Sequence, residues 1–110
     1  MTNASDQLIF KRLEEGAVIA SLELLCGVDD AEVLNVETVS SHRRRGLATS
    51  LLQEAMDWAR QNRRSALWLE VRASNNAAID LYLEIGFAQI STRACYYADG
   101  ENALVMKYTL

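Results

Sequence analysis

The first third of the chain alternates apolar and polar residues with the period of β-strands. Three segments carry this pattern and are rich in apolar and β-forming residues: 7–13, 17–25 and 31–39. Short breaks at 14–16 and 26–30, each containing a glycine, separate them. Consecutive strands with such short connections pair most simply as hairpins, so we expect three sequential antiparallel strands.

After residue 46 the apolar period changes to that of an α-helix. Apolar residues recur three or four positions apart at Leu47, Leu51, Leu52, Ala55 and Ala59, which predicts a helix over 46–61. Residues 66–71 are nearly all apolar, which is typical of a central strand covered on both faces. A strand, a helix and a strand in this order predict a right-handed crossover between two parallel strands.

A second helix is predicted between Ser74, Asn75 and Asn76, whose side chains can cap a helix, and Gly86, which can end one. Two strands, over 87–97 and 103–110, follow and are joined by a turn at residues 99–100. The predicted order is therefore β-β-β-α-β-α-β-β. We expect one α/β domain over 1–110, with a mixed, mostly antiparallel sheet and one central parallel β-α-β crossover.

Composition and charge exclude several classes of function. The 110 residues carry a net charge of −4 with a sequence pI of about 4.9, which argues against nucleic-acid binding. No apolar run approaches the length of a membrane span, and the first ten residues lack a signal-peptide pattern. Two cysteines are too few for a disulfide scaffold or a structural zinc site. We therefore expect a cytoplasmic protein without a metal that binds neither nucleic acid nor membrane.

One basic cluster contrasts with the net negative charge of the chain. Arg43, Arg44 and Arg45 directly precede Gly46, at the junction between a predicted strand and a predicted helix. The first N–H groups of a helix have no partner within it and favour negative charge. Small residues at Gly46 and Ala48 would let a phosphate approach them. The alternative is a solvated run of surface charge, and the residues alone leave both interpretations open.

Two sequence blocks resemble the GNAT acetyltransferase superfamily. An Arg-x-x-Gly-x-Ala string at 43–48 is similar to its acetyl-CoA pyrophosphate loop, and the spacing of residues 75–87 is similar to its later cofactor helix. The segment 68–75, together with Arg93, Tyr96 and Tyr97, resembles RimI-type enzymes, which acetylate the N-terminal amine of a ribosomal protein. The resemblance extends over residues 31–107.

The resemblance implies an acetyltransferase that takes acetyl-CoA as cosubstrate and acts on a protein or peptide N-terminus. The residues it implies for the acetyl-CoA site are Val36, Glu37, Thr38, Arg43, Arg44, Arg45, Gly46, Leu47, Ala48, Thr49 and Asn75. The three strand residues would act through their backbone, so a glutamate at 37, where RimI relatives usually have a small apolar residue, need not remove the contact. Asn75 is equally well explained as a helix cap.

Acetyl transfer to an amine needs a base for the amine and an acid for the departing thiolate. A free α-amine has a pKa of about 8, against about 10.4 for lysine, so one carboxylate base suffices for an N-terminus. The resemblance places the general base at Glu70, which interrupts an apolar strand, and the general acid at Tyr82. The alternatives are an ion pair for Glu70, Glu37 as the base, and simple core packing for Tyr82.

Tyr96 and Tyr97 line the acceptor side by resemblance, although alternation along a strand would explain the pair equally well. Cys26 and Cys95 lie beside no histidine in the sequence. We therefore expect direct attack in a ternary complex and no acetyl-cysteine intermediate.

The predicted hairpin begins close to the first residue, so we expect the strand and two helices that precede it in the family to be missing. Those helices form one wall of the acceptor groove, and a homodimer is one way to complete it. The alternative function is a non-catalytic acetyl-CoA-binding sensor or subunit. The presence of both Glu70 and Tyr82 favours the enzyme, because a pure binder needs neither.

Overall fold

The computed structural model describes residues 6–43 and 45–110. Its elements are β1 (Gln7–Glu14), β2 (Ala17–Cys26), β3 (Asp30–Thr38), α1 (Leu47–Gln61), β4 (Ala66–Arg72), α2 (Asn76–Ile85), β5 (Ala88–Arg93) and β6 (Ala103–Thr109). A short 3-10 helix, η2 (Ser40–His42), lies between β3 and α1. Each predicted strand and helix therefore has its counterpart. Of the helices that the structure describes, none has the length and apolar character needed to cross a lipid bilayer.

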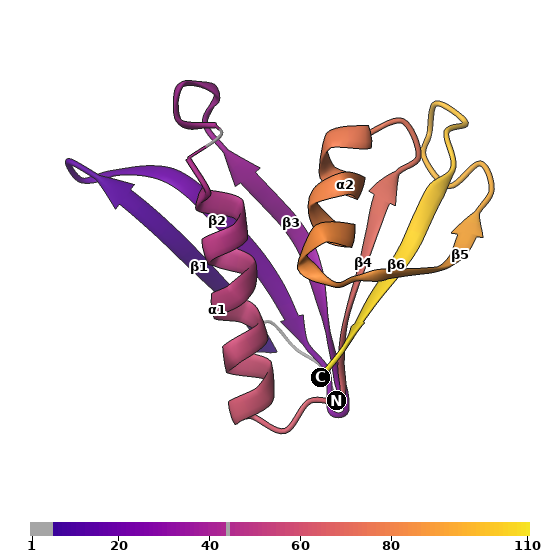
Figure 1. Ribbon diagram of the computed structural model, residues 1–110, viewed down its shortest axis with the longest axis horizontal. Coiled ribbons are helices and arrows are strands. Elements are labelled where there is room, and N and C mark those ends of the chain that lie inside the picture. The colour runs from indigo at the N-terminus through magenta and orange to yellow at the C-terminus, as the bar shows by residue number, and fades with distance from the viewer. Residues whose placement is uncertain (1–5, 44) are drawn as a thin grey trace.

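The six strands that the structure describes form one sheet in the order β1-β2-β3-β4-β6-β5. β3 and β4 are parallel, and the other neighbouring strands are antiparallel. α1 connects the two parallel strands, and Figure 1 shows both helices on the same face of the sheet. The predicted mixed, mostly antiparallel α/β sheet with one central parallel crossover is confirmed.

The core lies between this face of the sheet and the helices. The apolar stripe of α1, predicted from its helical spacing, is buried there. Alternate residues of the three strands beneath it are buried as well: Leu22 and Leu24 in β2, Ala31 and Val33 in β3, and Leu67, Leu69 and Val71 in β4. Each large aliphatic side chain buried in this way contributes about 1.5–3 kcal/mol. The intervening residues of β4, Trp68, Glu70 and Arg72, consequently point to the opposite face.

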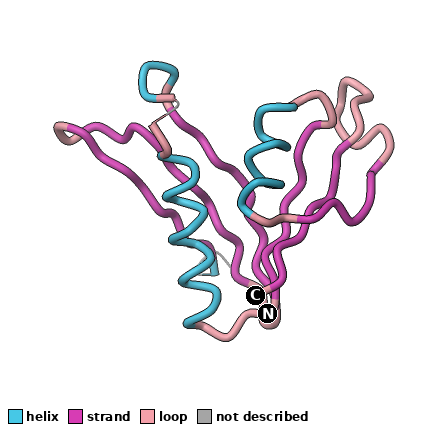
Figure 2. The backbone as a smooth tube through the Cα atoms, in the orientation of Figure 1, coloured by secondary structure: helices cyan, strands magenta, loops and turns pink. Residues whose placement is uncertain are grey.

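β3 and β4 pair over a short stretch and then separate. Their ladder joins residues 30–33 to residues 66–69. Beyond it, Leu34 is an extra residue in β3, because Val33 faces Leu24 on β2 while Asn35 faces the adjacent Glu23. A bulge of this kind bends the strand and increases its twist. The two halves of the sheet therefore diverge toward the end at which both helices begin, as Figures 1 and 2 show.

The predicted strand over 87–97 is wrong in its second half. β5 ends at Arg93, which pairs with Ala103, the first residue of β6. β5 is an edge strand with β6 as its neighbour, so residues 94–97 have no strand opposite them. They belong to a loop over residues 94–102, in which Cys95 has a positive φ of 53°. Tyr96 and Tyr97 are therefore loop residues, and strand alternation does not explain them.

Candidate active site

A cleft of about 920 Å³ lies where the two halves of the sheet diverge. It is bounded by β3 and by the first turns of α1 and α2. Most of the residues predicted for an acetyl-CoA site line it: Val36, Glu37, Thr38, Arg43, Gly46, Leu47, Ala48, Thr49 and Asn75. Because two helix N-termini contribute to its wall, the cleft favours an anionic ligand.

Gly46 gives the approach to α1 a backbone conformation that other residues resist. It caps α1 with a φ of 76°, in the left-handed region, and the space that a Cβ would occupy is open. No side chain caps this helix within the described residues, so the N–H groups of its first turn are left for a ligand. The first turn of α1 therefore has free backbone donors at the edge of the cleft.

The structure describes two of the three arginines before Gly46, and these two have different surroundings. Arg43 lines the cleft, and its Nε donates a hydrogen bond to the carbonyl oxygen of Thr38 at 3.4 Å. Arg44 lies outside the described residues. Arg45 is absent from the described lining of the cleft, because its Nη1 lies 3.1 Å from Oε2 of Glu14 in β1.

His42 lines the cleft and was missed by sequence reasoning. Its Nε2 lies 2.5 Å from Oε2 of Glu14, the same oxygen that Arg45 contacts. Hydrogen bonds from Arg45 and then from His42 hold the pKa of Glu14 below its usual value. Glu14 therefore ties the β1–β2 hairpin to the loop before α1. Glu14 and His42 are 28 positions apart, so no local pattern in the sequence could reveal their contact.

Asn75 acts as the N-cap of α2. Its Oδ1 accepts a hydrogen bond from the backbone N–H of Ala78 at 3.2 Å. The residue also lines the cleft, together with Ala77 and Ala78, so capping and contact with a ligand are compatible. Ala78 belongs to the sequence block that resembles the cofactor helix, whereas Ala77 was not predicted to line a site.

Replacing Asn75 with alanine should lower the free energy of unfolding by about 1 kcal/mol, because the N–H of Ala78 loses its acceptor. Asn75→Ser keeps a side-chain oxygen at the cap and should restore most of this loss. Urea unfolding of the three proteins measures both effects. Equal stability of the wild type and the alanine variant would contradict the capping role.

A second cleft, of about 240 Å³, opens beside the gap between β3 and β4. Glu70 and Arg72, from the outward face of β4, line it together with Tyr97 of the 94–102 loop. Three residues line both clefts: Val36, Asn75 and Tyr82. The clefts therefore meet at these residues, and ligands held on opposite sides of the sheet can come into contact there.

Glu70 is a carboxylate in the second cleft, with a side chain that is 19% exposed. Its Oε1 accepts a hydrogen bond from the hydroxyl of Tyr96 at 3.3 Å, and its Oε2 lies 2.9 Å from Nε of Arg93. The contact with Arg93 is an ion pair without hydrogen-bond geometry. Oε2 is buried and has no hydrogen-bond partner among the described residues. The ion pair considered from the sequence therefore exists.

Tyr82 combines core packing with a position at both clefts. Its ring packs against that of Phe87, with centroids 5.7 Å apart and an interplanar angle of 60°. Burial raises the pKa of its hydroxyl above the usual value of 10. The hydroxyl therefore stays protonated at neutral pH, and the residue that carries it lines both clefts.

Both tyrosines of the 94–102 loop lie near Glu70: the Tyr96 hydroxyl donates to it, and Tyr97 lines the same cleft. Their rings meet edge to face with centroids 5.1 Å apart. The guanidinium of Arg72 lies over the Tyr97 ring, 4.0 Å from its centroid. Burial raises the pKa of Tyr97, and the charge of Arg72 opposes that shift.

The structure separates the two carboxylates considered as the base. Glu37 lines the helix-side cleft but not the second one, which contains Glu70. A third carboxylate, Glu32, lies opposite Trp68 on the same sheet face as Glu70, outside the described lining of both clefts. Burial, followed by the charge of Glu70, raises the pKa of Glu32, while Arg93 lowers it. Of these three, only Glu70 lines the second cleft.

Known proteins are similar to this chain in both sequence and fold. Residues 2–87 match the Acetyltransferase (GNAT) family. The [ribosomal protein bS18]-alanine N-acetyltransferase of Escherichia coli (strain K12) is 37% identical over 112 residues, covering 96% of this chain and 76% of that enzyme. The crystal structure of the Escherichia coli ribosomal-protein-S18-alanine N-acetyltransferase matches with a TM-score of 0.89 at 34% identity, covering 97% of this chain and 71% of that one.

A GNAT family acetyltransferase from Elizabethkingia anophelis, solved with acetyl-CoA bound, has the same fold at 14% identity, with a TM-score of 0.89. The match covers 96% of this chain and 78% of that one. At this identity the likeness concerns the fold alone. The family match and the Escherichia coli relative carry the assignment, and the chain belongs to the GNAT family of acetyltransferases.

Proposed function

We propose that this protein transfers the acetyl group of acetyl-CoA to the N-terminal α-amino group of a protein or peptide, such as a ribosomal protein, by direct attack in a ternary complex. The observation that carries the proposal is the pair of clefts that meet at Val36, Asn75 and Tyr82. One cleft suits an elongated anionic cosubstrate, and the other holds a carboxylate beside two tyrosines. The Escherichia coli relative, which acts on an alanine of a ribosomal protein, supports this acceptor class.

The helix-side cleft fits acetyl-CoA in size and chemistry. Its volume of about 920 Å³ is within the range of small-molecule sites. The pyrophosphate belongs at Gly46 and the first turn of α1, with Arg43 beside it. Beyond residue 33, β3 has no further pairs with β4 among the described residues. Its backbone can therefore hydrogen-bond the pantetheine amides, which take the place of a neighbouring strand. The thioester then lies near Tyr82.

The acceptor belongs in the second cleft, where Glu70 takes a proton from the incoming ammonium, directly or through a water. The neutral nitrogen attacks the thioester carbonyl carbon, the C–N bond forms and the C–S bond breaks. Tyr82 gives its proton to the departing sulfur and is reprotonated by the second proton that the nitrogen loses, while Glu70 releases the first proton to solvent. Deprotonation at neutral pH costs about 1 kcal/mol for an α-amine and about 4–5 kcal/mol for a lysine, so a single carboxylate favours the N-terminus.

The proposal is tested by measuring acetyl-CoA binding calorimetrically and then turnover on a short peptide with a free N-terminal alanine. The control peptide has the same sequence with a blocked N-terminus and one internal lysine. We expect binding, turnover on the first peptide and intersecting initial-velocity lines. Binding without turnover would contradict the proposal in favour of a non-catalytic acetyl-CoA sensor, and acetylation of the blocked peptide would contradict the proposed acceptor.

Replacing Gly46 with valine should weaken acetyl-CoA binding about tenfold, because a left-handed backbone costs a residue with a Cβ about 1–2 kcal/mol. Gly16→Val is the matched control: Gly16 also has a positive φ (82°) and open space around it, but it lies in the β1–β2 turn. Calorimetry should show the loss for the first variant only. Equal affinities for both variants would contradict a phosphate site at Gly46.

A further inference from the structure

We infer that Arg72 is a positioning residue for the acceptor: it holds the 94–102 loop, and with it Tyr97, beside Glu70. The inference rests on the proposed function, in which the cleft lined by Glu70, Arg72 and Tyr97 receives the acceptor. Arg72 follows Glu70 by two positions on β4, so both side chains lie on the same face of the sheet.

The Arg72 guanidinium contacts three residues of the loop. Its Nη1 lies 2.8 Å from Oδ2 of Asp99 and 2.9 Å from Oε1 of Glu101. Its Cζ lies 4.0 Å from the centroid of the Tyr97 ring, which is a cation–π contact. The Arg72 side chain therefore contacts both acidic residues of the loop and one face of the Tyr97 ring.

Further hydrogen bonds fasten the loop to the segment between β4 and α2. Oε2 of Glu101 accepts from the backbone N–H of Ser74 at 2.8 Å, and the carbonyl of Asn102 accepts from the N–H of Ala73 at 3.0 Å. Within the loop, the N–H of Tyr97 donates to the carbonyl of Glu101 at 3.1 Å. The backbone of Tyr97 is thus tied to the same residue that Arg72 contacts.

The sheet itself does not order this loop, because the β5–β6 ladder ends at Arg93 and Ala103. The position of Tyr97 therefore depends on contacts outside the ladder, and of these Arg72 makes the contact with the ring face and with both acidic side chains. Both of its acidic partners carry a charge at neutral pH. The pKa of Asp99 is lowered first by the Glu101 backbone N–H, and that of Glu101 first by Ser74.

The test begins with Arg72→Met, which keeps an extended side chain but removes its charge and its donors. We expect kcat/KM for the acceptor peptide to fall about tenfold, because the acceptor is less well oriented, while the Kd for acetyl-CoA stays the same. An unchanged kcat/KM would overturn the inference.

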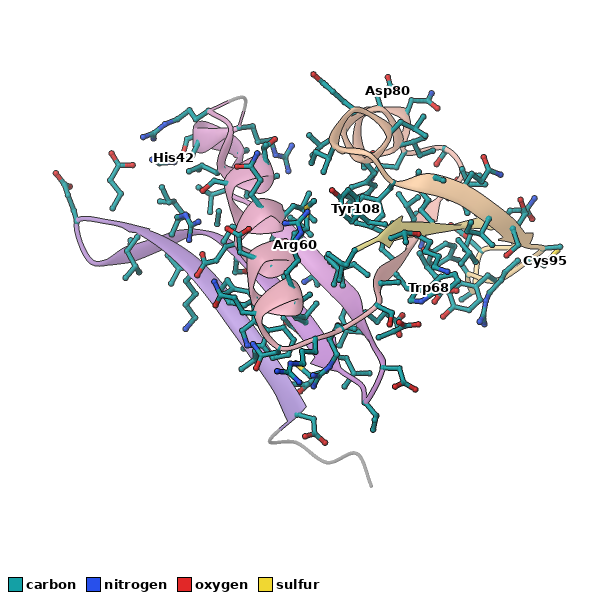
Figure 3. All side chains as sticks on the ribbon, turned by 60° about the horizontal axis from the view of Figure 1, so that its bottom comes forward. His42, Arg60, Trp68, Asp80, Cys95 and Tyr108 are labelled. Atoms are coloured by element: carbon teal, nitrogen blue, oxygen red, sulfur yellow. The ribbon has the colours of Figure 1, made fainter. Side chains whose placement is uncertain are left out.

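Arg60→Met is the matched control and should leave kcat/KM unchanged. The Arg60 side chain is 48% exposed, against 44% for Arg72, and it also lies over a tyrosine ring, that of Tyr108, and contacts a carboxylate, that of Asp57. Figure 3 shows Arg60 and Tyr108 well away from Cys95 in the 94–102 loop.

A double-mutant cycle separates positioning from a general loss of structure. Tyr97→Ala should lower kcat/KM in the wild type but have little further effect in Arg72→Met, because the tyrosine is already misplaced there. If the two losses multiply instead, Arg72 does not act through Tyr97 and the inference fails. Should Arg72→Met not fold, Asp99→Asn and Glu101→Gln each remove one partner and enter the same cycle.

Backbone amide exchange gives a readout that needs no activity. In the wild type the N–H groups of Ser74 and Tyr97 are hydrogen-bonded, and we expect both to exchange faster in Arg72→Met while the amides of β4 keep their protection. Unchanged exchange would overturn the inference. A wild type that binds acetyl-CoA but acetylates no peptide would instead count against the proposed function, and the exchange experiment would still decide the role of Arg72.

Discussion

Replacing Glu70 with glutamine should lower kcat for peptide acetylation about 100-fold or more, with the affinity for acetyl-CoA unchanged. The amide has nearly the shape of the carboxylate and can still accept the hydrogen bond from Tyr96. It cannot take a proton from the ammonium of the acceptor. Because the helix-side cleft is not lined by Glu70, the binding of acetyl-CoA should not respond.

Glu32→Gln is the matched control for this experiment. Glu32 is a carboxylate on the same sheet face, it interacts with the charges of Glu70 and Arg93, and it lies outside the described lining of both clefts. Steady-state kinetics should show a large loss for Glu70→Gln alone. Full activity of Glu70→Gln combined with a lower melting temperature would assign Glu70 to structure, as the partner of Arg93.

Replacing Tyr82 with phenylalanine should lower kcat by roughly 10- to 100-fold, because the departing thiolate loses its proton donor. The ring keeps its contact with Phe87, so stability should change little. Burial raises the pKa of Tyr82, so its proton is retained to higher pH than that of an exposed tyrosine. In the wild type, any fall of kcat that comes from ionisation of Tyr82 should therefore occur above about pH 10.

Tyr108→Phe supplies the comparison for Tyr82→Phe. Tyr108 packs on Phe87 as well, with centroids 5.6 Å apart, but its hydroxyl bonds to Arg60 and it is absent from the described lining of both clefts. Rate measurements at saturating substrate should show a loss for Tyr82→Phe and none for Tyr108→Phe. Equal rates for all three proteins would reduce Tyr82 to a core residue.

The elements of this fold were largely predictable from local patterns. The helical spacing of the apolar residues in α1 and the apolar run of β4 both depend on which side chains must be buried, and that information is local. The length of β5 was not predictable in this way. It depends on where β6 begins, and the loop beyond Arg93 is held by Arg72, a residue more than 20 positions earlier in the chain.

The candidate site is likewise predictable only in part from local patterns. A glycine before a helix and an asparagine at a helix start are local signals, and both residues line the predicted cleft. The second cleft depends on the extra residue in β3, which becomes visible only in the pairing with β2. Arg93 beside Glu70 and Glu14 beside His42 are likewise tertiary contacts that no spacing in the sequence indicates.

The alternation of β4 has a consequence for how enzymes of this design can diversify. Leu67, Leu69 and Val71 complete the core, whereas Trp68, Glu70 and Arg72 face the opposite side of the sheet, where we propose that the acceptor binds. Arg72 lines the proposed acceptor cleft but is not the proposed base, so changes at this position can alter acceptor binding while the helix-side packing and the donor site stay as they are. Substitutions on the two faces of β4 can therefore change specificity and folding stability nearly independently of each other.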